Sequence, residues 1–156
     1  MQPALLRYLR VASPDAAEDV AAEVWLHVVR DLAGFVGDAD AFRGWTFTIA
    51  RHRAIDHGRA RAARPAVPVA DVDPGEQAPS AEAEAVERDA TREALTMVAT
   101  LPPEQAEMVM LRVVAGLDVE TVAEIVGKKP GTVRVAVHRA LKTLREQAPQ
   151  NPREVV

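Results

Sequence analysis

Residues 118–145 read DVETVAEIVGKKPGTVRVAVHRALKTLR, and this pattern predicts two helices joined by a tight turn. Asp118 is suited to cap the first helix, because its carboxylate can accept a hydrogen bond from a free backbone N–H. Gly127 suits the turn that ends this helix. Ala123 is small enough for two helices to cross closely, and Val133 is spaced to pack the second helix onto the first. This order of small, glycine and aliphatic residues is typical of a helix-turn-helix.

The second helix of this motif opens at Pro130 and is expected to continue to about residue 147. Its face opposite Val133 is basic, and no acidic residue occurs between positions 125 and 145. That face carries Thr132, Arg134, Val135, His138, Arg139 and Lys142. A recognition helix in the DNA major groove uses such a face, although a plain helical hairpin with a basic exterior is the alternative interpretation.

The residues before this motif predict further helices of the same unit. The segment LPPE at residues 101–104 indicates a helix start, because proline is favoured in the first turn, and Gly116 is expected to end that helix. Ser80 is a candidate cap for an earlier helix rich in Ala, Glu and Arg. We therefore expect residues 85–147 to form one small helical unit, followed by a tail at residues 148–156.

The first part of the chain predicts a second helical unit, over residues 1–64. A helix capped by Ser13 or Asp15 is expected to reach about Leu32, followed by a polar loop at residues 38–41 and a helix over residues 42–63. The apolar positions expected to form one stripe on the first of these helices are Val20, Val24, Leu26, Val28 and Leu32.

Five of the six aromatic residues lie between Trp25 and Phe47, directly before an arginine-rich run. Aromatic rings stack on unpaired bases and arginines neutralise phosphates, so this combination suits a protein that binds single-stranded nucleic acid. Two plainer interpretations stay open. The rings Trp25, Phe42, Trp45 and Phe47 would then form the hydrophobic core of a small unit, and the arginines a solvated helix face.

Composition excludes several classes of protein. The chain has 156 residues, of which 48% are hydrophobic and 27% charged, as in ordinary globular proteins. It has no cysteine, which excludes disulfides, zinc–thiolate sites and iron–sulfur clusters and is compatible with the cytoplasmic location that we expect. The apolar runs are too short to span a bilayer, and the first residues lack the long apolar stretch of a signal peptide.

The charge is distributed unevenly along the chain. The net charge is -4, which disfavours a strongly basic protein that binds nucleic acid by itself. Residues 65–90 hold one basic and seven acidic residues, whereas each flank has one more basic than acidic residue. Prolines gather in the same middle segment and disfavour helix and strand there. We therefore expect residues 65–84 to be a flexible, acidic, proline-rich linker between two compact units.

Two ordered sets of short motifs carry a family resemblance. The first set is DAAEDV at residues 15–20, WL at 25–26, FRGWTFTIAR at 42–51 and RAIDH at 53–57. The second set is LPPE at residues 101–104, GL at 116–117, VA at 122–123, GTV at 131–133 and HRA at 138–140. In this order the motifs resemble the extracytoplasmic-function group of the bacterial sigma-70 family.

The resemblance implies an all-α fold with two small domains: sigma region 2 at residues 1–64 and a helix-turn-helix region 4 at 85–147. It implies a promoter-specificity subunit, monomeric when free, whose partners are the RNA polymerase core enzyme and promoter DNA. Anti-sigma factors are common in the family, so such an inhibitor is a further expected partner. No enzymatic activity, cofactor or metal is expected.

The resemblance also implies three sets of site residues. The -35 promoter element would be read by Lys129 together with the basic helix face described above. The -10 element would be bound and melted by Phe42, Arg43, Trp45, Thr46, Arg51, His52 and Arg53. The core enzyme would be bound by Asp15, Glu18, Asp19 and Glu23.

The chain departs from the family pattern in three places. It begins close to the motif at residue 15, so most of the family's first helix is expected to be missing. His52 stands where the family often has asparagine, which bears on the -10 base preference. Val135 and Ala136 stand where a polar or basic pair is frequent, which bears on the -35 contacts.

Three other functions are alternatives. A helix-turn-helix repressor or activator that works without polymerase would explain residues 100–147 but leave the N-terminal unit unused, and it predicts a stable homodimer. An enzyme would need more than His52 and Asp56, which have metal-ligand spacing on a helix but no third partner in view. An inactive protein of the same family is the third alternative.

Overall fold

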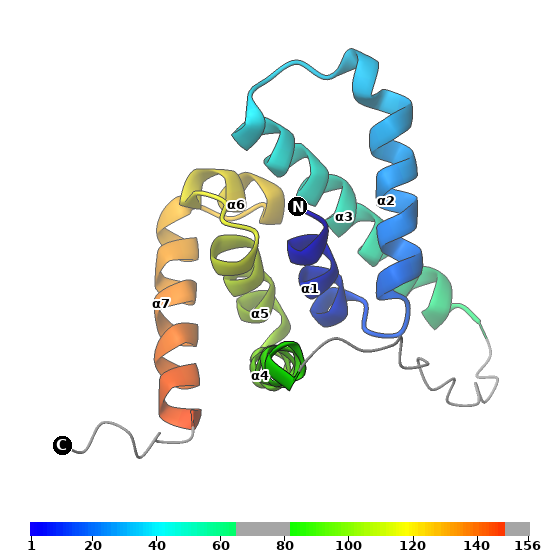
Figure 1. Cartoon of the computed structure of the whole chain (residues 1–156). Coiled ribbons are helices and arrows are strands. Elements are labelled where there is room, and N and C mark those ends of the chain that lie inside the picture. The colour runs from blue at the N-terminus through cyan, green and yellow to red at the C-terminus, as the bar shows by residue number, and fades with distance from the viewer. Residues whose placement is uncertain (65–81, 149–156) are drawn as a thin grey trace.

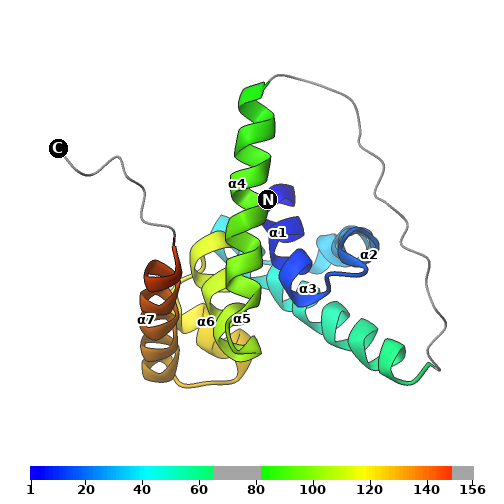
Figure 2. The same ribbon diagram turned by 90° about the horizontal axis from the view of Figure 1, so that it is seen from below.

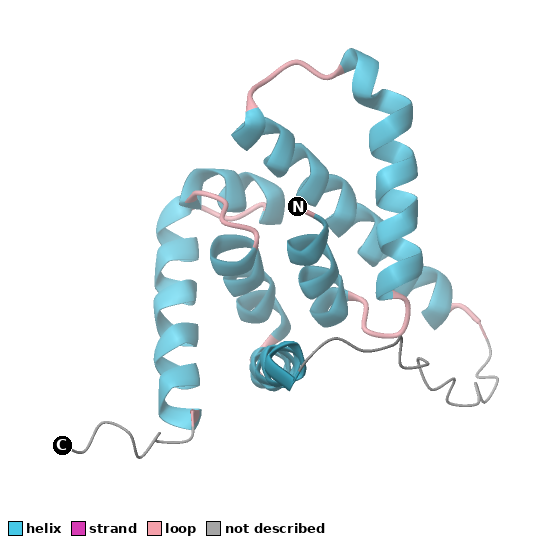
Figure 3. Cartoon of the chain, in the orientation of Figure 1, coloured by secondary structure: helices cyan, strands magenta, loops and turns pink. Residues whose placement is uncertain are grey.

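The computed structural model describes residues 1–64 and 82–148, with residues 82–86 described by their backbone alone. These residues form helices joined by short loops, with no strand among them (Figure 3). The N-terminal half holds α1 (Gln2–Ala12), α2 (Ala17–Asp31), a short 3-10 turn η1 (Leu32–Gly34) and α3 (Ala39–Ala62). The C-terminal half holds α4 (Glu82–Ala99), α5 (Pro103–Val109), a π-helical turn η2 (Met110–Val114), α6 (Val119–Val126) and α7 (Pro130–Gln147). The predicted all-α fold is confirmed.

Helix α1 is the element that the sequence pattern left unassigned. Its side chains Leu5, Tyr8 and Leu9 are fully buried, at the three- and four-residue spacing that places them on one helix face. This helix also explains why the expected cap of the next one is wrong. Ser13 ends α1 by donating its backbone N–H to the Leu9 carbonyl, and α2 begins after Ala16 with no side-chain cap.

Two expectations for the N-terminal half need correction. Helix α3 begins at Ala39, inside the expected polar loop, because the Asp38 carboxylate caps it by accepting a 2.8 Å hydrogen bond from the Ala41 N–H. The expected apolar stripe of α2 is also only half right. Val20, Val24 and Val28 are buried, whereas Leu26 and Leu32 are 72% and 50% exposed.

The helix-turn-helix is confirmed in each of its parts. The Asp118 carboxylate accepts a 2.7 Å hydrogen bond from the Thr121 N–H at the start of α6. Gly127 ends α6 in the left-handed conformation, with a φ of 69° that residues other than glycine rarely adopt. Ala123 and Val133 are buried where α6 and α7 pack against each other. Helix α7 begins at Pro130, as predicted.

The two halves pack against each other and share one hydrophobic core. Helix α1 lies between them: it contacts α2 and α3 on one side and α4, α5 and η2 on the other (Figure 1). Seen from below, α4 runs beside α1 and α5 (Figure 2). The halves are therefore not separate in this structure, in contrast to two units that touch only through a tether. Each half is small, and packing together buries more apolar surface than either could bury alone.

Parts of the linker prediction lie outside the described residues. These parts are residues 65–81, including the Ser80 cap, and most of the tail, at residues 149–156. Residues 82–84, assigned above to the linker, already belong to α4. No helix in the described ranges 1–64 and 82–148 is long and apolar enough to cross a membrane.

Candidate nucleic-acid interface

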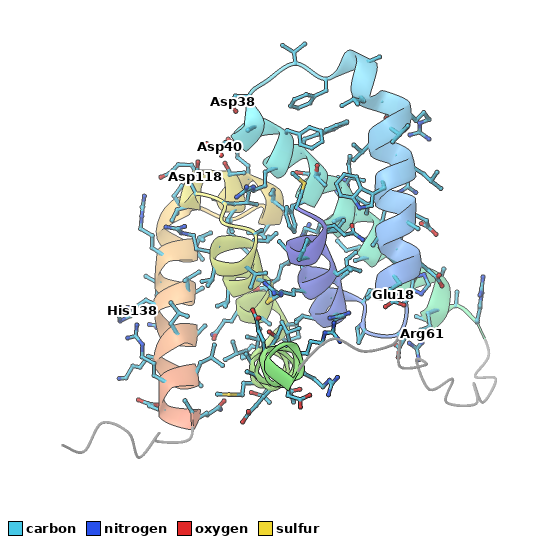
Figure 4. The ribbon with its side chains drawn as sticks, viewed as in Figure 1. Glu18, Asp38, Asp40, Arg61, Asp118 and His138 are labelled. Carbon is cyan, nitrogen blue, oxygen red and sulfur yellow. The ribbon has the colours of Figure 1, made fainter. Side chains whose placement is uncertain are left out.

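The exposed face of α7 carries the first predicted DNA-binding set. All members of this set are exposed: Lys129, Thr132, Arg134, Val135, His138, Arg139 and Lys142. The opposite face of helix α7 is buried through Val133 and Ala140, so its basic face stays open to solvent. Figure 4 shows His138 pointing away from the rest of the molecule. The arrangement offers cationic side chains on one exposed helix face, as a helix in the major groove requires.

One member of this face already has a protein partner. Arg134 Nη2 donates a 2.9 Å hydrogen bond to Oε1 of Glu120 on α6, and both side chains are mostly exposed. Exposed ion pairs contribute little stability, so a base or phosphate can replace the carboxylate at low cost. Glu120 could not be identified from the sequence as the partner of Arg134, because the two residues are fourteen positions apart and meet only when α6 and α7 cross.

Three aromatic rings form a cluster at the start of α3. Phe35 and Trp45 are stacked, with ring centroids 4.9 Å apart and an interplanar angle of 22°. Phe42 lies 5.5 Å from Phe35 and 5.8 Å from Trp45 in tilted or edge-on geometry. The three rings are only half-buried. Phe47, by contrast, is fully buried against Tyr8 with ring centroids 5.6 Å apart, so its role is packing.

The exposed side of Trp45 borders an open groove of about 560 Å³ between α2 and α3. Polar and charged residues line much of it, among them His27, His52, Arg53, Asp56 and Arg59. The His27 ring lies between Arg53 Nη2, 3.0 Å from its Nδ1, and the Asp31 carboxylate, 3.0 Å from its Nε2. This pairing fits a neutral ring that accepts at Nδ1 and donates at Nε2. The groove thus combines an aromatic ring, hydrogen-bonding groups and arginines.

Three of the residues predicted for the -10 element do not face this groove: Thr46 is buried, and Arg51 and Arg43 contact the C-terminal half. Thr46 is fully buried, and its hydroxyl donates a 2.9 Å hydrogen bond to the Phe42 carbonyl. Arg51 Nε donates a 2.7 Å hydrogen bond to Glu107 of α5. Arg43 Nη1 donates to the Ala115 carbonyl at 3.3 Å. The structure therefore brings Phe42, Trp45, His52 and Arg53 together on the outer side of α3. It places Arg43, Thr46 and Arg51 on other sides of the helix.

The acidic residues predicted to bind polymerase lie on and just before α2. Asp15 forms an ion pair with Arg61 of α3, while Glu18, Asp19 and Glu23 are exposed. Figure 4 shows Glu18 and Arg61 at the same end of the N-terminal half. The same helix exposes Leu26 and Val29 by 72% and 71%. A mixed acidic and apolar face of this kind suits a protein partner.

The residues that the structure describes contain no cluster of three or more His, Asp or Glu side chains placed to hold a metal. His27 and Phe35 are the parts of this site that the sequence analysis missed. Phe35 could have been predicted from the sequence, since it is one of the aromatic residues between Trp25 and Phe47. His27 could not, because its contact with Arg53 joins positions 26 residues apart.

Comparison with known families and proteins agrees with this architecture. Residues 1–64 match the family described as Sigma-70 region 2, and residues 91–144 match Sigma-70, region 4. The chain is 34% identical over 155 residues to the ECF RNA polymerase sigma factor SigD of Mycobacterium tuberculosis H37Rv, covering 94% of this chain and 73% of SigD. It is 32% identical over 152 residues to the ECF RNA polymerase sigma factor BldN of Streptomyces coelicolor, covering 94% of this chain but only 56% of BldN.

One solved structure shares the fold. It is the sigma factor RpoE of Bartonella quintana in complex with the anti-sigma factor NepR, with a TM-score of 0.67 and 23% identity. The similarity covers 92% of this chain and 89% of the RpoE chain. The likeness therefore extends over both halves of the chain.

Proposed function

Because the chain belongs to the extracytoplasmic-function group of the sigma-70 family, we propose that it is a promoter-specificity subunit that directs RNA polymerase core enzyme to its promoters. Sigma factors of this family are regulatory subunits rather than enzymes, and they act where the polymerase is, in the cytoplasm. We infer the same for this chain. Its contribution would be binding and positioning of DNA, with the chemistry carried out by the polymerase.

The basic face of α7 is the observation that best supports this proposal. It would read the -35 element as duplex DNA, with Arg134 exchanging Glu120 for a base edge. The groove between α2 and α3 would hold unpaired -10 bases beside Trp45, His52 and Arg53. The acidic and apolar face of α2 would bind the core enzyme. An anti-sigma factor stays a prediction from the family resemblance, since the complex with NepR is a property of the Bartonella quintana protein.

The main alternative is a helix-turn-helix repressor or activator that acts without polymerase. It explains the match to region 4 but not the match to region 2. Region 2 is matched over residues 1–64 and region 4 over residues 91–144, in the order of a sigma factor. The net charge of -4 also argues against tight binding of free DNA, because most non-specific affinity comes from neutralising phosphates.

Run-off transcription from a promoter library tests the proposal directly. The full chain is mixed with core polymerase, and transcripts are sequenced to find the selected promoters. We expect promoter-specific transcripts only when chain and core enzyme are both present, and weak, salt-sensitive binding of duplex DNA by the chain alone. Nanomolar, sequence-specific binding by the isolated chain at physiological salt would support the repressor instead.

A further inference from the structure

The His27 ring bridges α2 and α3 in the wall of the groove that Trp45 borders. Its Nε2 lies 3.0 Å from the carboxylate of Asp31, one helical turn further along α2. Its Nδ1 lies 3.0 Å from Nη2 of Arg53 on α3. The side chain of His27 is 25% exposed, so the bridge lies neither in the core nor free in solvent. One ring thus joins a carboxylate of its own helix to a guanidinium of the facing helix.

The partners of the ring determine which nitrogen donates and which accepts. Two guanidinium groups face Nδ1, from Arg53 at 3.0 Å and from Arg30 at 3.3 Å, and a guanidinium can only donate, so Nδ1 accepts. The hydrogen bond from Arg30 is the main cause that lowers the pKa of Asp31, so this carboxylate stays ionised and accepts at Nε2. Asp31 therefore anchors the ring with its Nδ1 lone pair directed at Arg53.

The bridge restrains Arg53 without using up its hydrogen-bonding groups. Among the residues that the structure describes, His27 is the one hydrogen-bond partner of the Arg53 guanidinium. A guanidinium has five N–H donors, so a contact with one ring nitrogen leaves most of them for a ligand. Arg53 is half-buried and lines the same groove as Trp45, which lies ~12 Å away along the axis of α3. The groove therefore holds a fixed cation some distance from an aromatic ring.

Stabilising the fold does not account for this arrangement. Buried apolar residues of both helices, among them Val24, Val28 and Ala50, already belong to the hydrophobic core. Partly exposed polar pairs contribute little stability, and ordering an arginine side chain is opposed by its conformational entropy. A side chain that is already held in place loses less of this entropy when it binds a ligand. What the bridge adds to Arg53 is therefore preorganisation.

We propose that His27 is a positioning residue for the -10 element, which holds the Arg53 guanidinium in the groove, ready for a phosphate of the unpaired strand. A guanidinium matches the oxygens of a phosphate and binds it with charge-assisted hydrogen bonds. His27 acts through Arg53 and does not itself touch the DNA. The holding of Arg53 is a property of the free chain, whereas its effect on DNA rests on the proposed function.

NMR of the arginine side-chain nitrogens tests the holding of Arg53 without DNA or polymerase. A guanidinium held at Nη rotates slowly and gives separate Nη signals, which are assigned to Arg53 by their absence from the Arg53→Ala chain. We expect His27→Phe, which keeps a ring but has neither nitrogen, to merge these signals into one. His57→Phe makes the same substitution on α3 outside the groove lining and should leave them separate. Unchanged Arg53 signals in the His27→Phe chain would overturn the proposal.

Binding of a pre-melted -10 template by the full chain with core polymerase tests the effect on DNA. We expect His27→Phe to weaken binding about threefold to tenfold, the gain that comes from ordering one flexible side chain beforehand. His27→Asn should recover most of this loss, because its side-chain oxygen can accept from Arg53 in place of Nδ1. In the Arg53→Ala background, His27→Phe should have no further effect, since the residue through which it acts is gone.

Two outcomes contradict this role of His27. One is an equal loss from His27→Phe with and without Arg53, and the other is an equal loss from His27→Phe and His27→Asn when both chains keep parental helicity by circular dichroism. If the parent chain with core polymerase neither binds the template nor supports transcription, the proposed function fails, while the nitrogen signals still decide whether His27 holds Arg53.

Discussion

Helices α3 and α7 are both basic, yet they are built into the molecule differently. The main contacts of helix α7 are with helices of its own half, α4, α5 and α6, and one face of α7 is exposed to solvent. Helix α3 packs against α1 and α2 of its own half and also against α6 of the other half. Most of its residues between Phe42 and His57 are therefore buried or half-buried.

This difference separates the two surfaces that we propose bind DNA. The face of α7 is available as it stands, with Arg134 held only by an exposed ion pair to Glu120. The residues of α3 are divided between an open groove, which holds His52 and Arg53, and a contact between the halves, which holds Arg43 and Arg51. A helix that both packs the fold and binds DNA has little surface free for the second task.

The largest expected effect tests whether the interior side of α3 is structural. Phe47→Ala removes a fully buried ring that packs against Tyr8, so we expect the free energy of unfolding to fall by ~3–5 kcal/mol. Val135→Ala on the exposed face of α7 is the control and should change it by less than ~0.5 kcal/mol. Thermal or urea denaturation measures both, and similar values for the two would remove the contrast between the helices.

The next effect tests whether α7 reads bases. A bidentate contact from Arg134 to a guanine is worth ~1–3 kcal/mol of discrimination, so Arg134→Ala should relax the preference at one or two positions of the -35 element. Lys142→Ala should lower affinity evenly for all sequences, as loss of a phosphate contact does. Selection of -35 sequences with the polymerase holoenzyme measures both. Equal, sequence-independent losses would mean that Arg134 contacts only phosphate.

The same contrast explains how much the sequence could predict. The helix-turn-helix followed from Asp118, Gly127 and Val133, because capping, a left-handed glycine and apolar spacing are local signals. The open face of α7 followed from them as well. The contact of Arg51 could not be predicted from the sequence, since its partner Glu107 is 56 positions away and comes close only when the two halves pack together.

The exposed apolar residues of α2 illustrate a related limit. Leu26 is apolar and fits the expected stripe, yet it is exposed. The local sequence does not distinguish an apolar side chain that packs into the core from one that stays on the surface. Helix α1 was missed for a different reason. Its apolar pattern, built on Leu5 and Leu9, is short and predicts a helix only weakly. The helix is stabilised by packing against helices of both halves.

A smaller effect is expected on the acidic face of α2, the third surface of the N-terminal half. Reversal of two exposed charges, Glu18→Lys with Asp19→Lys, should weaken binding to the core enzyme about fivefold to tenfold while the fold survives. Asp89→Lys with Glu93→Lys on α4 makes the same change in net charge on exposed residues elsewhere and serves as the control. Titration of labelled chain with core polymerase measures both. Unchanged affinity after reversal at residues 18 and 19 would place the docking surface elsewhere.

The smallest effect concerns His52, which lies in the groove on the open side of α3. Its side chain is exposed, so His52→Asn should leave the stability of the fold unchanged. Asparagine presents a carbonyl oxygen and an amide where the imidazole presents ring nitrogens, so the hydrogen bonds offered to an unpaired base differ. We expect a change of a few-fold, less than ~1 kcal/mol, in the base preferred at one -10 position.

A pre-melted promoter separates this reading of bases from the melting step. On duplex templates the preference combines the cost of unstacking a base with the contacts made to it afterwards, whereas on pre-melted templates only the contacts remain. The His52→Asn chain should show its altered preference on both templates. If it keeps the parental preference on both, His52 does not read the -10 element. The groove side of α3 would then bind unpaired DNA through Trp45 and Arg53 without selecting its sequence, and α7 would be the helix that supplies specificity.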